Sequence, residues 1–313
     1  MKLAFVFPGQ GSQSIGMMNG FSAHPMVRRA FDEASEALGE DLWTMAAEST
    51  PEVISLTTNT QPLMLTADVA VWRAWRETSS CLPEIVAGHS LGEYAALVAA
   101  ESLTLADAVT LVRFRADAMQ RAVPEGMGAM AAILGLSDEA VISLCQSRST
   151  EQSRVEAVNF NGPGQVVIAG HKTAVEALTV AAKEAGAKRA VILPVSAPFH
   201  STLLAPAVDQ LRERLKSVAI APPKIALIHN VDVSEHQEPD AIREALATQA
   251  AKPVRWTETL KALTGRGVTH IVECGPGKVL AALNKRGAEG AQSFALTDSA
   301  AIDATHQTLL GAQ

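Results

Sequence analysis

The sequence is poor in aromatic residues and cysteine, and it has no long apolar run. Aromatic residues make up 4% of the 313 residues. The three cysteines, Cys81, Cys145 and Cys274, lie far apart without a C-x-x-C pair, which favours a reducing compartment and predicts no metal site. The first apolar run, Leu3 to Phe7, is too short for a secretory signal, and no later run approaches membrane-spanning length. We therefore expect a cytoplasmic protein with no membrane partner.

Basic residues are outnumbered by acidic ones. Lys and Arg total 26 against 33 Asp and Glu, which gives a net charge of -7. This balance argues against a nucleic-acid partner, which would require a basic face. Hydrophobic residues reach 48% and charged residues 19%, a composition typical of a chain with a large packed core. The length suits one large domain or two ordinary ones, and we expect a monomer.

Apolar runs and helical periodicities alternate along most of the chain, which predicts an α/β protein with a mainly parallel sheet. Strands are expected at "KLAFVF", before "GHSLG", and later at "KIALIHN" and "THIVECG". The helices expected between these strands lie near residues 26–38, 61–76, 105–122, 203–217 and 239–263, with a final helix from Lys278.

Residues 125–195 follow a different order: strand, helix, strand, strand, helix and strand, which is typical of a ferredoxin-like fold. We interpret this stretch as an insertion. The predicted architecture is an α/β, hydrolase-like large domain with a mainly parallel sheet and a nucleophile elbow, formed by residues 1–124 and 196–313. The inserted ferredoxin-like α+β subdomain is formed by residues 125–195.

The stretch "GHSLG", residues 88–92, fits the nucleophile elbow motif G-x-S-x-G. Its glycines permit a sharp strand-to-helix turn that would lift the hydroxyl of Ser90 clear of the sheet. The main-chain N–H of Leu91 would then point toward a developing oxyanion. The alternative is an ordinary strand-to-helix turn with a capping serine. His89, next to the serine, is expected to serve packing.

The glycine-rich stretch "PGQGSQSIG" does not fit a dinucleotide-binding loop. Ser14 occupies the place of the third glycine, and no acidic residue follows a second strand at the expected distance. We instead expect this loop to supply a second oxyanion N–H, from Gln10, and we expect no redox cofactor.

The helix near residues 105–122 carries an arginine on its apolar face. At about 100° per residue, Arg115 falls in a stripe with Ala108, Leu111, Val112 and Met119. A guanidinium buried there needs a partner, because an unpaired buried charge is costly. One interpretation is an internal salt bridge. The other is a bidentate clamp for a substrate carboxylate, which would favour a transferase over a simple esterase.

The segments "FPGQGSQ", "GHSLGEYAALVAA", "PVSAPFH" and "VECGPGKVL", together with Arg115, closely resemble malonyl-CoA:acyl carrier protein transacylases. The resemblance covers essentially the whole chain, including the insertion. It implies an acyltransferase that moves the malonyl group from malonyl-CoA to the phosphopantetheine thiol of acyl carrier protein through an acyl-serine, supplying fatty-acid synthesis. It implies no metal and no cofactor.

The resemblance also implies the roles of individual residues. It makes Ser90 the nucleophile, His200 its base and Arg115 the ligand of the malonyl carboxylate. It assigns two oxyanion-hole amides and the main-chain carbonyl that orients the histidine to Gln10, Leu91 and Gln249. Phe199, directly before the base, is expected to wall the acyl pocket and to disfavour methylmalonyl.

Other interpretations stay open. A serine thioesterase or esterase would support its histidine with a carboxylate, for which Asp232 is the candidate. A carrier-binding module would bind the carrier without forming an acyl-serine, and a polyketide carrier is an alternative acceptor. Since this chain is acidic, docking of an acidic carrier requires local basic residues, for which the candidates are Lys183, Lys188, Arg189, Lys285 and Arg286.

Overall fold

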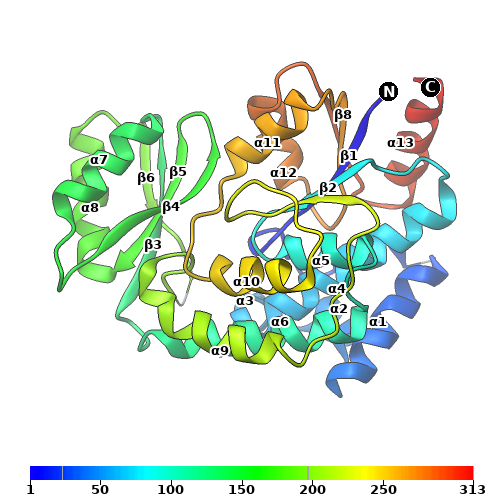
Figure 1. Cartoon of the computed structure of the whole chain (residues 1–313), viewed down its shortest axis with the longest axis horizontal. Coiled ribbons are helices and arrows are strands. Elements are labelled where there is room, and N and C mark those ends of the chain that lie inside the picture. The colour runs from blue at the N-terminus through cyan, green and yellow to red at the C-terminus, as the bar shows by residue number, and fades with distance from the viewer. Residues whose placement is uncertain (23, 196, 313) are drawn as a thin grey trace.

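The computed structural model describes residues 1–22, 24–195 and 197–312, and its strands form two separate sheets (Figure 1). The larger sheet is parallel, with the strand order β7 (Ala226–Ile228), β2 (Ile85–Gly88), β1 (Leu3–Phe7), β8 (His270–Glu273) and β9 (Gln292–Ala295). The parallel sheet predicted from the sequence is therefore confirmed. Strands β1, β2 and β8 are buried throughout, because helices cover both faces of the sheet.

Alternate side chains of β1 enter two different hydrophobic cores. Phe5 and Phe7 belong to the larger core, and Ala4 and Val6 belong to the smaller one on the opposite face. The larger core is built with α1 (Pro25–Leu38), α4 (Thr57–Thr78), α5 (Gly92–Ala99), α6 (Leu105–Ala122), α9 (Ala205–Leu215) and α10 (Pro239–Gln249). The smaller core is built with α11 (Trp256–Gly265) and α12 (Val279–Gly287).

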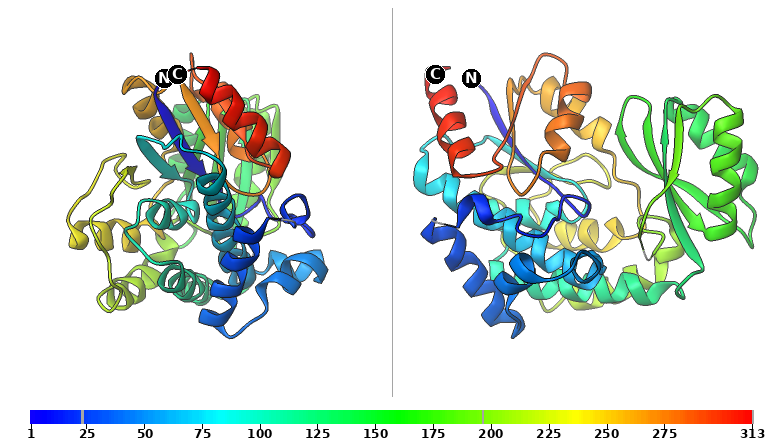
Figure 2. Two further views of the ribbon diagram at one scale, coloured as in Figure 1. Left: turned by 90° about the vertical axis from the view of Figure 1, so that its right-hand side faces the viewer. Right: turned by 180° about the vertical axis from the view of Figure 1, so that it is seen from behind.

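The second sheet is antiparallel and lies at the opposite end of the molecule from the two termini (Figures 1 and 2). Its strand order is β4 (Val155–Gly162), β5 (Gln165–His171), β3 (Gly128–Leu134) and β6 (Arg189–Ile192), and a third core joins it to α7 (Asp138–Arg148) and α8 (Lys172–Glu184). The β-α-β-β-α-β order predicted for this stretch is confirmed.

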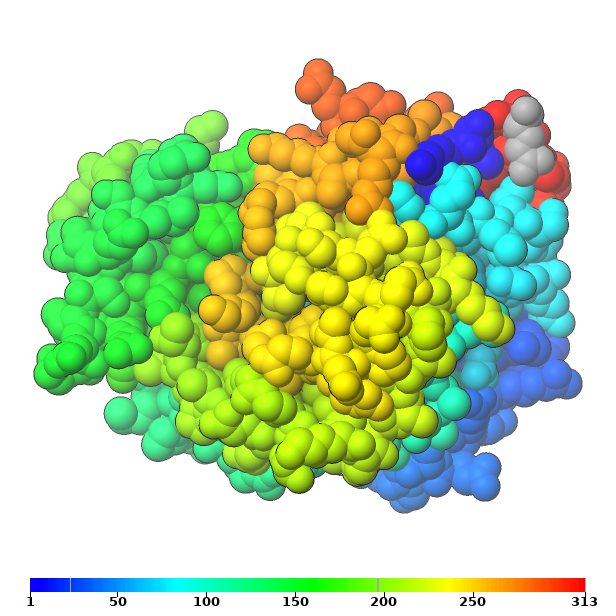
Figure 3. All heavy atoms as spheres, viewed as in Figure 1, coloured from blue at the N-terminus to red at the C-terminus, as the bar shows by residue number. Residues whose placement is uncertain are grey.

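Main-chain hydrogen bonds join the two parts of the fold beside β4. The N–H of Val254 donates to the carbonyl of Val158 at 2.9 Å, and the N–H of Phe160 donates to the carbonyl of Val254 at 3.0 Å. Figure 3 shows the segment that follows α10 lying against the smaller sheet. Residue 196, at the predicted boundary of the insertion, and residue 313 lie outside the described residues.

The prediction that the helix from Lys278 is the last element is wrong. That helix ends at Gly287, and β9 and α13 (Ser299–Gly311) follow it. Strand β9 escaped detection because it is short and only partly buried at the sheet edge. Four further elements were not predicted from the sequence: the short helices α2 (Leu42–Glu48) and α3 (Pro51–Ser55), and the 3₁₀ turns Asn19–Phe21 and Thr202–Leu204. None of the described helices combines the length and apolar character needed to cross a membrane.

A buried pair of carboxyl groups lies between α4 and the end of β8. Glu273 accepts N–H groups of Leu280 and Ala281 at the start of α12, at 3.0 and 2.6 Å. Asp68 is fully buried, and neither of its oxygens has a hydrogen-bond partner among the described residues. Burial and the nearby Glu273 raise the pKa of Asp68 well above its usual value. Burial also raises the pKa of Glu273, to about 7, but the N–H groups it accepts favour its charged form, so Asp68 is the member of the pair that keeps its proton more firmly.

We expect Asp68→Asn to remove a pH dependence of stability. The folded chain keeps a proton on Asp68 that the unfolded chain releases above about pH 4. The free energy of unfolding therefore falls as the pH rises above that value, by up to about 1.4 kcal/mol per pH unit. Asparagine has the shape of the neutral acid, so the variant should match wild type near pH 4 and exceed it at pH 7.

Chemical denaturation between pH 4 and 8 measures this difference, with Asp303→Asn as an exposed control on α13. A gap between Asp68→Asn and wild type that stays constant over this pH range would contradict the assignment.

Candidate active site

The predicted elbow forms where the first two strands of the parallel sheet end side by side. Phe7 of β1 pairs with Gly88 of β2, and the N–H of His89 donates to the carbonyl of Phe7 at 2.9 Å. A Cβ on Gly88 would lie 1.9 Å from the carbonyl carbon of Gly92, and a Cβ on Gly92 would lie 2.0 Å from the oxygen of Phe7. Both positions therefore require glycine, which explains the motif in steric terms.

Ser90 stands at the tip of this turn in a strained conformation, with φ of 54°. Asn230, which follows β7, holds the turn in place. Its side-chain oxygen accepts the N–H of Ser90 at 2.7 Å, and its side-chain nitrogen donates to the carbonyl of Gly88 at 2.6 Å. The strain at the serine is therefore offset by hydrogen bonds from the segment that follows β7.

His200 faces Ser90 across the pocket, with 2.7 Å between its Nε2 and the serine Oγ. Its Nδ1 lies 2.9 Å from the carbonyl oxygen of Gln249 and 3.2 Å from that of Lys252. Since carbonyl oxygens only accept, Nδ1 carries the proton and Nε2 is free to accept from the serine. The structure thus places the carbonyl of Gln249 where the resemblance assigns it.

The carboxylate required by the hydrolase interpretation does not reach this histidine. Asp232 instead contacts His236, with 2.7 Å between its oxygen and the ring Nε2. Burial, followed by the positive charge of Arg115, lowers the pKa of His200 to about 3. The imidazole is therefore neutral at pH 7 and able to accept a proton.

Arg115 is buried beside the serine, with 2% of its surface exposed. Its Nη1 donates to the side-chain oxygen of Gln61 at 2.8 Å, and its Nη2 donates to that of Gln249 at 2.8 Å. Nη2 also lies 3.3 Å from the Oγ of Ser90. In the described part of the chain no carboxylate forms an ion pair with this guanidinium, so the internal salt bridge considered from the sequence is absent there. Its charge points into the pocket without a counterion.

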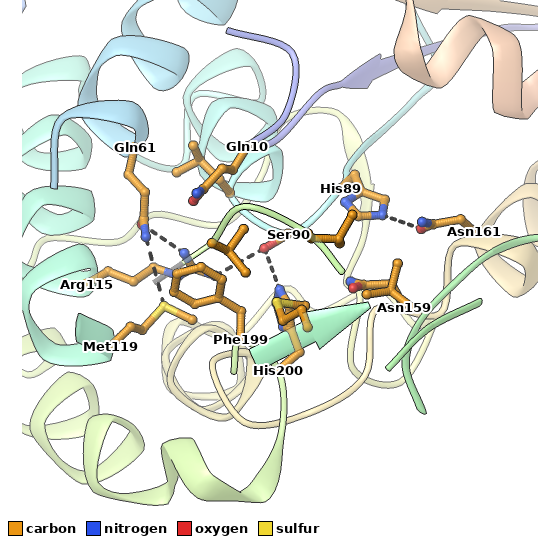
Figure 4. A pocket seen from close by; sticks show the side chains of 15 residues that line it. Gln10, Gln61, His89, Ser90, Arg115, Met119, Asn159, Asn161, Phe199 and His200 are labelled. Carbon is orange, nitrogen blue, oxygen red and sulfur yellow. Dashed lines mark hydrogen bonds between the residues drawn. The ribbon is translucent and has the colours of Figure 1, made fainter. Parts of the chain in front are cut away.

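The pocket between the two parts of the fold has a volume of about 200 Å³ (Figure 4). Gln10, Leu91 and Phe199 line it together with the serine, the histidine and the arginine. Within the described ranges, no acceptor takes the main-chain N–H of Gln10 or Leu91. A Cβ on Gly9 would lie 2.5 Å from the carbonyl oxygen of His89, so the loop of Gln10 packs directly on the elbow. The site residues predicted from the sequence thus meet in one place, and their roles stay predictions.

Sequence reasoning missed several polar side chains of the site. Gln61, on α4, lines the pocket and accepts a hydrogen bond from Arg115. The side chain of Gln249, at the end of α10, accepts another from behind the pocket wall. His89 packs on Trp256 as expected, but it also lines the pocket, with 2.8 Å between its Nε2 and the oxygen of Asn161. The described residues contain no cluster of three His, Cys, Asp or Glu side chains suited to a metal. These glutamines and asparagines belong to no sequence motif, because their partners are distant in the sequence and are brought to them only by the fold.

A neutral Ser-His pair on an elbow, beside open main-chain amides, defines the class of serine enzymes that react through an acyl-serine, hydrolases and transferases alike. The acyl transferase domain model matches residues 4–311. The malonyl CoA-acyl carrier protein transacylase of Salmonella typhimurium is 48% identical over 304 residues, which cover 97% of this chain and 98% of the relative. The Bacillus subtilis protein of the same name is 44% identical over 98% of this chain and 97% of its own length.

Solved structures that resemble this chain carry the same kind of name as these relatives. The acyl-carrier-protein S-malonyltransferase of Burkholderia pseudomallei superposes with a TM-score of 0.96 at 54% identity, covering 98% of this chain and 100% of the other. A malonyl-transacylase solved in complex with a type II polyketide acyl carrier protein has a TM-score of 0.96 at 45% identity, with the same coverage. The chain belongs to the acyl transferase family and, within it, to the malonyl CoA-acyl carrier protein transacylases.

We expect the acylation rate to persist at unusually low pH. Since the active form of His200 is the neutral one, a pKa held near 3 keeps kcat/KM for acyl-CoA flat from pH 8 down to pH 5. Arg115→Ala removes one cause of that lowering and should move the acidic limb toward higher pH. The profile is measured with acetyl-CoA, which carries no carboxylate for the arginine. A wild-type rate that falls tenfold between pH 7 and 6 would contradict the low pKa.

Proposed function

We propose that this protein transfers the malonyl group of malonyl-CoA to the phosphopantetheine thiol of acyl carrier protein and so supplies fatty-acid synthesis. The relatives named above act on malonyl CoA and acyl carrier protein according to their names. Within this chain, the observation that carries the proposal is the buried guanidinium of Arg115 beside the serine. It suits an acyl group that ends in a carboxylate, and it has no use in a plain esterase.

The reaction proceeds in two matched steps. His200 takes the proton of Ser90, whose Oγ attacks the thioester carbonyl, and the amides of Gln10 and Leu91 stabilise the oxyanion. The carbon–sulfur bond breaks, and coenzyme A leaves with the proton held by His200. The carrier thiol then enters, loses its proton to His200 and attacks the carbonyl of the acyl-serine. The ester carbon–oxygen bond breaks, and His200 returns the proton to the Oγ of Ser90, so both residues regain their starting states.

Arg115 holds the acyl group through both steps. Only one methylene separates the malonyl carboxylate from the reacting carbonyl. Because the guanidinium lies 3.3 Å from the serine Oγ, it can bind the carboxylate while the carbonyl carbon is attached to the serine. The neutral amides of Gln61 and Gln249 set the plane of the guanidinium without cancelling its charge. Phe199, 7% exposed, lies on the wall of the same pocket, where it would disfavour an added methyl group.

Two of the basic residues proposed for carrier docking, Lys188 and Arg286, lie near the same end of the smaller sheet. Lys183, Lys188, Arg189, Lys285 and Arg286 are all exposed. Arg286, on α12, donates to the side-chain oxygen of Gln165 on β5 at 2.9 Å. Across the sheet, the N–H of Gly135 donates to the carbonyl of Gly164 at 2.8 Å, and Lys188 packs on Gly135. Lys188 in the insertion and Arg286 on α12 of the larger part of the fold therefore lie near the same pair of strand ends.

We further propose that residues 1–124 and 196–313 form one domain around the insertion, residues 125–195. The protein is proposed to act as a cytoplasmic monomer, independent of membrane and nucleic acid. Sedimentation of the purified protein at micromolar concentration tests the monomer.

Arg115→Ala should lower kcat/KM for malonyl-CoA by roughly 30- to 1000-fold, since about 2–4 kcal/mol of charge-assisted hydrogen bonding is lost. Arg115→Lys keeps the charge but not the fork and should also lose malonyl transfer. Acetyl-CoA should change far less. Rates with both donors, and intact-protein mass spectrometry of the acyl-serine, measure these effects.

Arg113→Ala is the matched control, because Arg113 lies on the same helix and pairs with Glu40 away from the pocket. Ser90→Ala should show no adduct. Equal losses with malonyl and acetyl donors in Arg115→Ala would sink the carboxylate clamp, and release of free malonate as fast as carrier loading would indicate a hydrolase.

Reversing the charge at Lys188, Arg189 and Lys285 should weaken loading of the carrier at least tenfold and reduce its salt dependence. Formation of the acyl-serine from malonyl-CoA should be unchanged, because the pocket is untouched. Lys216→Glu, on an exposed lysine paired with Glu213 near the end of α9, is the control. If carrier kinetics and their response to salt match wild type, docking uses another face.

A further inference from the structure

Gln249 contacts three residues of the proposed mechanism, which are Ser90, Arg115 and His200. It ends α10 and is fully buried. Its main-chain oxygen accepts from His200, and its side-chain Oε1 accepts from Nη2 of Arg115 at 2.8 Å. Its side-chain Nε2 donates to the carbonyl of Ser90 at 3.0 Å and to Oε2 of Glu93 at 2.9 Å. The side-chain contacts are separate from the carbonyl that supports the histidine.

Glu93 lies behind this glutamine in the first turn of α5 and is also fully buried. Its Oε1 is 2.8 Å from Nδ1 of His229, and its Oε2 accepts the N–H of Asn230 at 3.0 Å as well as the amide of Gln249. Among the described residues no Lys or Arg pairs with this carboxylate. The N–H of Asn230 and the side-chain nitrogen of Gln249 are both donors, so the carboxylate of Glu93 accepts each of these two hydrogen bonds.

The chemistry of the two ends fixes the direction of the Gln249 amide. A guanidinium can only donate, and a carboxylate can only accept. The amide oxygen must therefore face Arg115, and the amide nitrogen must face Glu93. A flipped amide would leave two donors facing each other at Arg115 and two acceptors at Glu93, and unsatisfied buried groups of this kind are costly.

We propose that Glu93 is a positioning residue for the acyl carboxylate, acting through the side-chain amide of Gln249 to aim the guanidinium of Arg115 into the pocket. This rests on the proposed role of Arg115 as the carboxylate ligand. Glu93 touches neither the substrate nor the reacting atoms. It supplies a buried negative charge one amide away from the guanidinium, which stabilises the charge of Arg115 without occupying its pocket side.

This arrangement separates two tasks that a direct ion pair would combine. A carboxylate bound directly to Arg115 would stabilise the guanidinium but compete with the malonyl group for the same N–H donors. An intervening neutral amide also accepts from Nη2, but a neutral acceptor is displaced or shared at smaller cost than an ion partner, so the donor stays accessible to the malonyl carboxylate.

The experiment compares Glu93→Gln, Gln249→Met and the double variant in kcat/KM for malonyl-CoA and acetyl-CoA. Glutamine at position 93 has no charge and can donate as well as accept, so the Gln249 amide is then fixed at the Arg115 end alone and is held less firmly. Methionine at position 249 keeps the volume and the main-chain carbonyl to His200 but removes the amide. We expect each single variant to lower the malonyl-to-acetyl ratio by roughly 10- to 100-fold. The double variant should be no worse than Gln249→Met alone, since both changes break one chain of contacts.

Glu273→Gln is the matched control, because Glu273 is another fully buried glutamate, on β8, and it contacts α12 instead of the site. It should leave the malonyl-to-acetyl ratio unchanged. If Glu93→Gln does not fold, as judged by circular dichroism, Gln249→Met still tests the amide. The inference is overturned if the single variants lower both donors equally, or if their effects multiply in the double variant.

These outcomes are distinguishable from a failure of the proposed function. If Arg115→Ala leaves the malonyl-to-acetyl ratio intact, the carboxylate clamp itself is wrong. If Arg115→Ala changes the ratio and Glu93→Gln does not, only the positioning role of Glu93 is wrong.

Discussion

A permanent positive charge buried without an ion partner is the constraint around which this site is built. Arg115 enters from the apolar face of α6, and helices α4 and α10 each contribute one amide oxygen to hold it. The amide of Gln249 that holds the guanidinium also bonds to Glu93 and to the carbonyl of Ser90 in the elbow. The position of the guanidinium is therefore tied to that of Ser90 and its partner His200. Misplacing any of these helices would leave a charge in an apolar core, which is far more costly than a lost packing contact.

The site also contains backbone strain, at Ser90 and His200, the two residues that exchange a proton in the proposed mechanism. Ser90 has φ of 54° and His200 has φ of 65°, both in the left-handed region that non-glycine residues seldom adopt. Each is held by hydrogen bonds from other segments, to Asn230 in one case and to Ala250 in the other. The parallel pairing of β1 with β2 then sets the Gln10 loop against the elbow. Geometry that is costly locally is therefore maintained by contacts distant in sequence.

The sequence was informative where a residue type is forced by a local requirement. The glycines of the elbow, the periodicity that buried Arg115, and the β-α-β-β-α-β order of the smaller sheet could all be recognised from short stretches. Strand β9 could not, because a short edge strand with partly exposed side chains carries no distinctive pattern. The side-chain amides of Gln61 and Gln249 were missed for a different reason. Their partners are brought to them by helices far apart in the chain, and a buried glutamine looks like a surface one in sequence.

The support of His200 by carbonyl oxygens has a consequence for the leaving group. An imidazolium beside two neutral oxygens and near Arg115 gains no counterion, so the protonated histidine is a high-energy, short-lived species that readily gives up its proton. A thiolate, whose conjugate acid ionises near pH 8.5, is a good leaving group and can depart even though this proton donor exists only briefly, whereas an amine must be protonated as it leaves. The catalytic pair is thus suited to exchange between two thiols of similar basicity, a nearly balanced reaction that runs in either direction.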